Sequence, residues 1–245
     1  QYELMPGSLE SLDNVNFIIT HDLSGTLTNM IALADFLKSH VLENAEFKKY
    51  LHLYNTIHNF GGEALTIIRG LVSLLELQKL PVDELEKETV DIKALVEKEV
   101  SDFYYRNEDK AFKIECKNTD IPLKVDVIQN QLGKAISEIL LYLVKMSRSV
   151  KPVFIELESS PDKQDVLIFI YGQNLKLPEK SLIKALERSH RLNLDDVQGK
   201  KLSGMLELIL AKEIIELHEG RLIFCQNEEN DGFQLQLPAV STNEG

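Results

Sequence analysis

A histidine followed directly by an aspartate, His21 and Asp22, is the pair of residues best suited to chemistry in this chain. A deprotonated imidazole nitrogen is a nucleophile, and a neighbouring carboxylate can accept the ring proton. Ile19 and Leu23 lie two positions before and after the histidine. In a helix, which turns by about 100° per residue, His21 points about 200° away from both. The pair is therefore either an exposed nucleophile with its base or an ordinary solvated histidine on a helix surface.

The remaining histidines and the two cysteines predict no metal site. Cys116 and Cys225 each lack a second cysteine or a histidine at ligand spacing, so we interpret both as reduced core residues of a cytoplasmic fold. His218, in the segment IIELHEG, lies where a helix ends and is expected to be structural. Surface or capping roles fit the other four, which are His40, His52, His58 and His190.

Two long amphipathic helices are predicted between residues 10 and 80, where proline is absent and apolar residues recur at steps of three and four. Polar residues around Asn44 mark the turn, and the second helix stops before Pro81. Two helices cannot bury both apolar stripes alone, so we expect a homodimer whose hairpins form a four-helix bundle. The stripes are Val15, Ile19, Leu23, Met30, Leu33 and Leu37, then Phe47, Leu51, Tyr54, Leu65, Ile68, Val72 and Leu75.

A second domain is predicted after a charged linker at 81–88, over residues 89–240. Helical patterns alternate there with short apolar or alternating runs, which is typical of an α/β layered domain with a mixed sheet. The expected helices are 92–107, 128–147, 178–189 and 204–218, and the expected strands are 112–117, 122–127, 153–158, 166–171, 221–226 and 233–238.

The composition argues for protein partners. A net charge of -12, from 39 acidic and 27 basic residues, disfavours a nucleic-acid partner because such binding depends on basic side chains that neutralise phosphates. No apolar run reaches the roughly 20 residues needed to cross a bilayer. Because the sequence begins at Gln1, we expect it to be a piece of a longer protein.

The run FIITHDLSGTLTNMIALADFLKS resembles the dimerisation and phosphoacceptor helix of two-component histidine kinases. Leu23 and Leu27 match the family pattern after the histidine and its acid, whereas Ser24, Gly25 and Thr26 depart from it. The resemblance implies that His21 is phosphorylated with Asp22 as general base, that a response-regulator receiver domain is the partner, and that Gly25 lacks the polar group that aids dephosphorylation. The residues implied to contact that partner are Ser24, Gly25, Leu27 and Thr28.

The second domain resembles, in element order, the ATP-binding domain of the same kinases. The resemblance places Tyr142 where the family has the asparagine that coordinates Mg²⁺, and a neutral phenol is a poor magnesium ligand. No carboxylate stands near Tyr171 or Gly172 to accept the adenine amino group. In the phosphate-binding turn the family's glycines become Met205 and Glu207, so that only Gly204 remains nearby.

Two further residues of the long helix belong to this degenerate site. Glu138 replaces an earlier asparagine, while Lys145 matches a common basic position. The combined losses resemble the dimeric histidine phosphotransferases derived from kinases, so no cofactor is expected. Two alternatives stay open: a kinase core that phosphorylates His21 from ATP and Mg²⁺ in a divergent site, and a non-catalytic dimeric scaffold for a response regulator.

Overall fold

The computed structural model describes residues 24–43, 50–79, 86–107, 113–117, 123–147, 152–179, 182–183, 186, 201–226 and 229–240, without the side chains of 40–43, 78, 117 and 201–205. The chain divides into two compact units. The first comprises residues 1–79 with 197–206, and the second comprises 80–196 with 207–245. No helix in the described ranges is long and apolar enough to cross a membrane.

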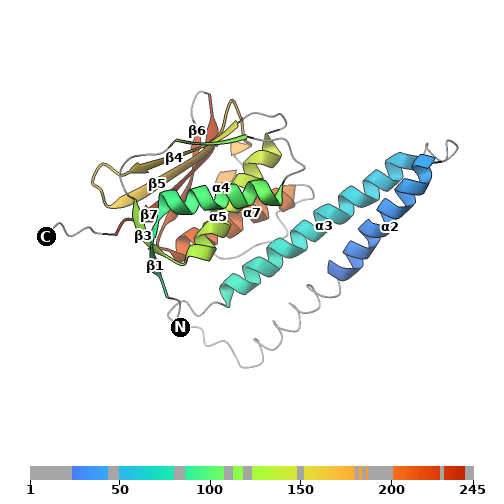
Figure 1. Ribbon diagram of the computed structural model, residues 1–245, viewed down its shortest axis with the longest axis horizontal. Helices are drawn as coiled ribbons and strands as arrows, with labels where there is room; N and C mark the ends of the chain where they lie inside the picture. The colour runs from blue at the N-terminus through green and yellow to red at the C-terminus, as the bar shows by residue number, and fades with distance from the viewer. Residues whose placement is uncertain are drawn as a thin grey trace. The chain divides into compact units, whose positions relative to one another are not determined.

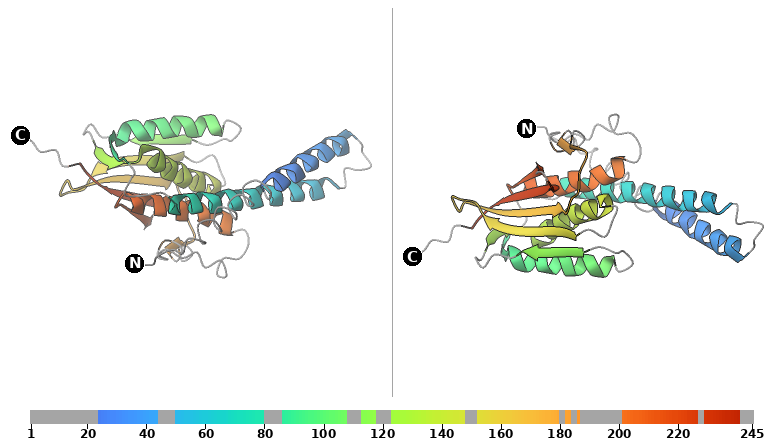
Figure 2. Two further views of the ribbon diagram at one scale, coloured as in Figure 1. Left: turned by 90° about the horizontal axis from the view of Figure 1, so that it is seen from below. Right: turned by 90° about the horizontal axis from the view of Figure 1, so that it is seen from above.

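The first unit contains the predicted hairpin of two antiparallel helices, α2 (Ser24–Glu43) and α3 (Leu51–Gln78), which lie side by side (Figures 1 and 2). Small residues bring the helices together. Ala34 is buried, and a Cβ atom added at Gly61 would lie 2.8 Å from Cγ1 of Ile31. A larger residue at position 61 would therefore push the helices apart.

Large apolar side chains remain exposed on both helices of the hairpin. The exposed fraction ranges from 39% at Leu37 to 59% at Phe36. On each helix these residues are spaced three or four apart, so they form a stripe rather than isolated contacts. The exposed residues are Met30, Leu33, Phe36 and Leu37 on α2, and Leu53, Ile57 and Phe60 on α3. The hairpin alone thus leaves a contiguous apolar surface in water, which is uncommon in a monomer.

The second unit is an α/β sandwich, as predicted. Its five-stranded mixed sheet has the order β2-β4-β5-β7-β6, with β2 parallel to β4 and the other neighbours antiparallel. The strands are β2 (Lys113–Lys117), β4 (Pro152–Ser159), β5 (Asp165–Gly172), β6 (Arg221–Gln226) and β7 (Asp231–Pro238). The helices are α4 (Ile92–Arg106), α5 (Gln129–Met146) and α7 (Lys201–Leu217), and they lie on one face of the sheet (Figure 1).

The core lies between this sheet and the helices. Burial alternates along β4 and β5, where Val153, Ile155, Val166, Ile168 and Ile170 face the helices and are at most 1% exposed. The side of α5 that faces the sheet is equally buried. Burial of each such aliphatic side chain contributes roughly 1.5–3 kcal/mol to the free energy of folding. The α5 residues in this layer are Leu132, Ile136, Ile139, Leu140 and Leu143.

One strand was missed by the sequence analysis. β1 (Glu88–Asp91) pairs antiparallel with β3 (Lys124–Val127), and Asp91 then caps α4 by accepting hydrogen bonds from the backbone N–H groups of Lys93 (2.9 Å) and Ala94 (3.2 Å). The four-residue run ETVD carries no strand pattern of its own. The strand forms by pairing with β3, which lies more than 30 residues further along the chain, so local sequence could not predict it. The helix predicted at 178–189 lies mostly outside the described residues.

The two cysteines are free, as predicted, but they are not core residues. Cys116 lies on β2 and Cys225 on β6, and both are half-buried. β2 and β6 are the two edges of the sheet, where side chains are covered from one side only. Burial raises the pKa of both thiols, which keeps them protonated and poorly reactive at neutral pH.

Candidate functional site

The predicted nucleophile and its base, His21 and Asp22, lie outside the described residues. The residues that follow them form the first turn of the described part of α2. Ser24, Gly25 and Leu27 are half-buried, and Thr28 is exposed. The Thr28 hydroxyl donates a hydrogen bond to the backbone oxygen of Ser24 at 2.8 Å, so the helix itself uses this donor.

Gly25 lies in open surroundings. A Cβ atom added there would meet no described atom within 4 Å, and no left-handed backbone conformation requires glycine at this position. Packing within the described part of the chain therefore does not explain why the residue four positions after His21 has no side chain. A polar residue would fit at this position.

Tyr142 occupies the position that the resemblance assigned to the magnesium-binding asparagine. The ring is 2% exposed and packs edge-on against Phe233, with ring centroids 5.8 Å apart and an interplanar angle of 74°. Burial, helped by the negative charge of Glu207, raises the pKa of Tyr142 to about 12. The phenol is thus neutral and part of the core, which makes it unfit to ligate a hard cation.

Lys145 and Glu207 bind each other across the gap between α5 and α7. The Lys145 ammonium donates a hydrogen bond to Oε1 of Glu207, which is only 5% exposed. Lys145, which matches a common basic position of the family, is therefore paired with Glu207, which stands where the family has a glycine. A buried carboxylate remains charged when a cation is paired with it, and removal of that cation lowers the stability of the fold.

Glu138, one turn before Tyr142 on α5, is half-buried. Burial raises the pKa of its carboxyl group, against the opposing positive charges of Lys134, Lys145 and Arg106. Glu138 and Lys145 thus lie on either side of Tyr142 along α5, at the position to which the resemblance assigned the magnesium ligand. In the described part of the chain no three His, Cys, Asp or Glu side chains form a cluster that could hold a metal ion.

The residues after β5 fill their own surroundings. A Cβ atom added at Gly172 would lie 2.7 Å from Cδ2 of Leu175, and Leu175 and Leu177 are at most 9% exposed. Asn174 adopts a left-handed conformation, with φ of 49°, and its backbone N–H donates to Oδ1 of Asn230 at 3.0 Å. The segment turns back on itself and lays leucine side chains where the resemblance expects a recognition site for adenine.

A carboxylate nevertheless lies beside Gly172, because Asp231 on β7 is its direct partner in the β5–β7 ladder. Asp231 is fully buried, and its Oδ2 accepts a hydrogen bond from the backbone N–H of Leu177 at 2.8 Å. Its Oδ1 lies 3.4 Å from the ammonium of Lys176, and its own N–H donates to the backbone oxygen of Leu175 at 3.1 Å. Asp231 therefore holds the segment that follows β5 in place through these contacts.

The sequence could not point to Asp231, because only residues next to Gly172 along the chain were candidates for the carboxylate. Residues paired across an antiparallel ladder have Cβ atoms about 4.5–5.5 Å apart, so the neighbouring strand can supply a group that the first strand lacks. The signal available in the sequence was an aspartate followed by a glycine directly before the last strand, which was predicted at 233–238. Its partner could be assigned only once the order of the strands was known.

Gly204 and Met205 lie inside α7, which begins at Lys201. Only the first four backbone N–H groups of a helix lack partners within it. The N–H groups of Met205 and Glu207 are therefore beyond the free end of the helix, and they are not available to bind a phosphate in the way expected of a loop at a helix start. The positions that the resemblance assigned to the phosphate-binding turn thus lie in the body of a helix.

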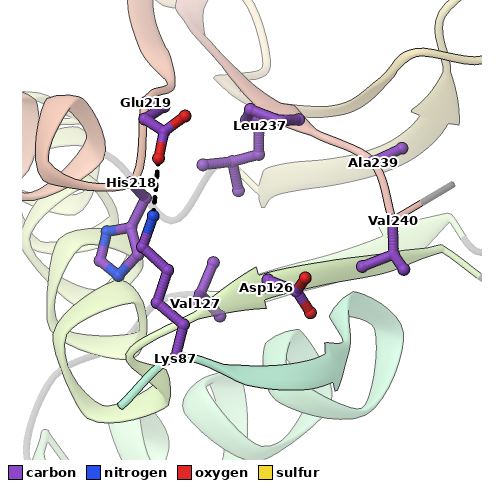
Figure 3. Close-up of a pocket in the computed structure, with 9 residues that line it drawn as sticks. Lys87, Asp126, Val127, His218, Glu219, Leu237, Ala239 and Val240 are labelled. Carbon is purple, nitrogen blue, oxygen red and sulfur yellow. Dashed lines mark hydrogen bonds and ion pairs between the residues drawn. The ribbon is translucent and has the colours of Figure 1, made fainter. Parts of the chain in front are cut away.

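A separate cavity of about 240 Å³ lies at the junction of β3, the end of β7 and the end of α7, and none of the residues that line it is a predicted site residue (Figure 3). The ammonium of Lys87 binds the carboxylate of Glu219 at its rim, 2.8 Å apart. His218 lines the cavity and is 2% exposed.

His218 has the structural role that the sequence indicated. Its Nε2 accepts a hydrogen bond from the backbone N–H of Ile128 at 2.9 Å, and its Nδ1 lies 2.7 Å from the backbone oxygen of Ile214. The ring is therefore the neutral tautomer with the proton on Nδ1. Burial lowers the pKa of His218, which fits this neutral form. The ring joins the end of α7 to the start of α5.

Solved structures with a similar fold are histidine kinases. Full-length ShkA in complex with AMPPNP has a TM-score of 0.59 at 15% identity, and the match covers 95% of this chain and 46% of that one. ThkA in complex with the response regulator protein TrrA has a TM-score of 0.59 at 15% identity, covering 93% and 64%. The Acinetobacter baumannii histidine kinase AdeS has a TM-score of 0.49 at 18% identity, covering 85% and 96%.

No protein-family model matches the sequence, and no curated protein matches it either. The fold alone therefore defines the class. This chain has the fold of a histidine-kinase core, in which a helical hairpin precedes an α/β sandwich of the kinase ATP-binding type.

Proposed function

We propose that this chain is a phosphotransfer protein of a two-component phosphorelay, in which His21 carries the phosphoryl group and ATP is not used. The observation that carries the proposal is the Lys145–Glu207 pair beside the buried Tyr142. Glu207 neutralises the positive charge of Lys145, and these side chains occupy the space that a magnesium triphosphate would need. The sandwich domain then serves as a packed structural unit.

The proposed reaction exchanges a phosphoryl group between His21 and the aspartate of a receiver domain. A deprotonated ring nitrogen of His21 attacks the phosphorus of the aspartyl phosphate, the phosphorus–oxygen bond to the aspartate breaks, and the aspartate leaves as a carboxylate. Asp22 accepts the proton of the ring nitrogen, and the reverse reaction returns it. No nucleotide enters this exchange.

The receiver domain is proposed to dock on the first turns of α2, at Ser24, Gly25, Leu27 and Thr28. ThkA, which shares the fold, was solved with a response regulator bound, and this supports a partner of the same kind for the present chain. Gly25 and the internally bonded hydroxyl of Thr28 leave few hydroxyl donors free on this surface to position a water molecule. We therefore expect weak phosphatase activity towards the bound regulator.

The homodimer remains part of the proposal. The exposed stripe of α2 and α3, with residues such as Leu33 and Phe60 more than half exposed, supports the pairing of two hairpins into a four-helix bundle. A second copy is the natural occupant, because an isologous contact covers the same stripe on both chains at once.

The proposal is tested by mixing the whole chain with phosphorylated receiver domain from the same pathway, without ATP. We expect acid-labile phosphate on the chain, and we expect the His21→Gln variant to take up none. Labelling of His21→Gln at the wild-type rate would refute the phosphoacceptor assignment and favour the scaffold alternative. Calorimetry with ATP and Mg²⁺ should detect no binding in the micromolar to submillimolar range.

One observation favours the alternative, a kinase core with a divergent ATP site. Asp231 brings a carboxylate opposite Gly172, beside the position where a carboxylate was expected to accept the adenine amino group. In this alternative its hydrogen bond to the Leu177 N–H would have to be exchanged for one to the base. Labelling of His21 from ATP alone, lost in Asp231→Asn, would establish that function in place of the first.

A further inference from the structure

The two free edges of the five-stranded sheet differ in how well they are protected. Within the described part of the chain, β2 pairs with β4 only and β6 with β7 only. β2 reads KIECK, with a charged residue at every second position. Charged side chains, lysine above all, are the usual means by which an edge strand resists pairing with another chain. The β2 edge is therefore protected.

The β6 edge lacks this protection. It reads RLIFCQ, with an uninterrupted apolar centre at residues 222–225 and no proline or lysine. Ile223 is 39% exposed on the face of the sheet opposite the helices. Among the described residues only β7 pairs with β6, so its other edge leaves backbone donors and acceptors beside apolar side chains, which is the pattern that favours addition of another strand.

The two ends of β6 carry charges of opposite sign, so they can attract one another when two copies of the strand run antiparallel. Arg221 begins the strand, and Glu229 lies in the turn that follows it; both are exposed. Two β6 strands that pair antiparallel bring Arg221 of each copy towards the turn of the other copy that carries Glu229. A parallel pair would place arginine beside arginine and glutamate beside glutamate. The charges therefore favour a second copy of this chain, related by a two-fold axis.

We propose that β6 is a homotypic interaction edge, at which two copies pair antiparallel and join their five-stranded sheets into one continuous sheet. The contact is separate from the stripe on α2 and α3, and it depends neither on His21 nor on a nucleotide. Because it buries only one strand edge and its flanking side chains on each copy, it is expected to be weak and concentration-dependent.

The pleat restricts the possible register of this contact. Directly opposite residues lie on the same face of a sheet, and successive residues alternate between faces. The best-centred registers therefore place either Ile223 opposite Ile223 or Phe224 opposite Phe224. In the first register a cysteine at position 223 lies opposite its own copy. In the second it lies opposite the native Cys225, so a disulfide can form in either case.

Sedimentation of the whole chain up to about 1 mM tests the contact. Ile223→Lys adds a charge to the exposed edge position, and the matched control Ile223→Thr keeps a β-favouring, uncharged residue. We expect wild type and Ile223→Thr to exceed the mass of Ile223→Lys at high concentration. In a Phe60→Glu background, which weakens the hairpin contact, the β6 contact alone remains and the masses should differ by a factor of two. Equal masses for all three proteins over the whole range would overturn the proposal.

Disulfide formation provides a second test that does not depend on how Ile223→Lys folds. Under mild oxidation, Ile223→Cys should give covalent dimers faster than Glu115→Cys, the matched change on the charged β2 edge. Adding Cys225→Ser separates the registers, because it abolishes the link only when Phe224 faces Phe224. Crosslinking of Ile223→Cys no faster than that of Glu115→Cys would show that the edges do not pair.

Discussion

The hairpin and the α/β sandwich differ in where their apolar side chains lie. In the sandwich, α5 alone buries five large aliphatic residues to at most 1% exposure. On the hairpin, seven large apolar residues are 39% or more exposed. The sandwich buries its large apolar residues within the unit, whereas the hairpin presents apolar surface, which we propose a second copy covers. The chemistry proposed for the chain belongs to the hairpin, since exchange of a phosphoryl group between proteins requires an accessible surface.

The same contrast holds for charged groups. In the sandwich, charged side chains are engaged inside the unit, as in the Lys145–Glu207 pair and the hydrogen bond that Asp231 accepts from the backbone N–H of Leu177. These charged groups of the sandwich are thus engaged in contacts inside that unit.

The largest effect is expected on the hairpin surface. Phe60→Glu places a charge in the exposed stripe and should convert the four-helix-bundle dimer to a form of half its mass, as measured by light scattering at micromolar concentration. The neighbouring change Asn59→Glu, which adds the same charge at an exposed polar position, should leave the mass unchanged. An unchanged mass for Phe60→Glu would remove the reason to treat the stripe as the dimer contact.

The next effect concerns the proposed base. Asp22→Asn should slow phosphoryl transfer to His21 by roughly a hundredfold, because a general base commonly contributes at least this factor. The mass and thermal stability should stay within error of wild type. The measurement is single-turnover labelling by a phosphorylated receiver domain. A rate equal to that of wild type would mean that another group accepts the ring proton.

A smaller effect is expected when the buried ion pair is broken. Lys145→Met leaves the carboxylate of Glu207 buried without its cation and should lower the free energy of unfolding by about 2–3 kcal/mol, less than for a fully buried pair because Lys145 is 35% exposed. Lys145→Met combined with Glu207→Leu should recover most of the loss, as measured by urea unfolding. If the double variant is as unstable as the single one, the pair is not the source of the loss.

The smallest effect concerns pH and His218. Its pKa is lowered in the folded chain, so the unfolded chain binds a proton more readily. The stability contributed by the neutral ring is fully present above the unfolded pKa of about 6.5, and it is lost as the pH falls towards the lower folded value. His218→Gln should therefore show a smaller drop in the urea midpoint between pH 7.5 and pH 5 than wild type does. An equal drop in both proteins would place the titrating group elsewhere.

Most of the secondary structure followed from local patterns. The predicted helix at 92–107 and strand at 166–171 differ from α4 and β5 by only one residue at an end. These elements have a clear period of their own, 3.6 or 2 residues, so their neighbours in the chain suffice to define them. β1 has no such period, and it forms because β3 offers it a partner.

The sequence by itself indicated the hairpin and the order of the sandwich elements, and it placed Tyr142 and Glu207 at the positions that the resemblance assigned to the magnesium ligand and the phosphate-binding turn. Only the tertiary structure decided that Lys145 meets Glu207 across 62 residues, that Asp231 faces Gly172, and that β6 ends the sheet with an apolar edge. The physical reason is that periodicity records which face of an element is buried. Which residues then meet depends on strand order and helix packing, and these are settled by the whole core at once.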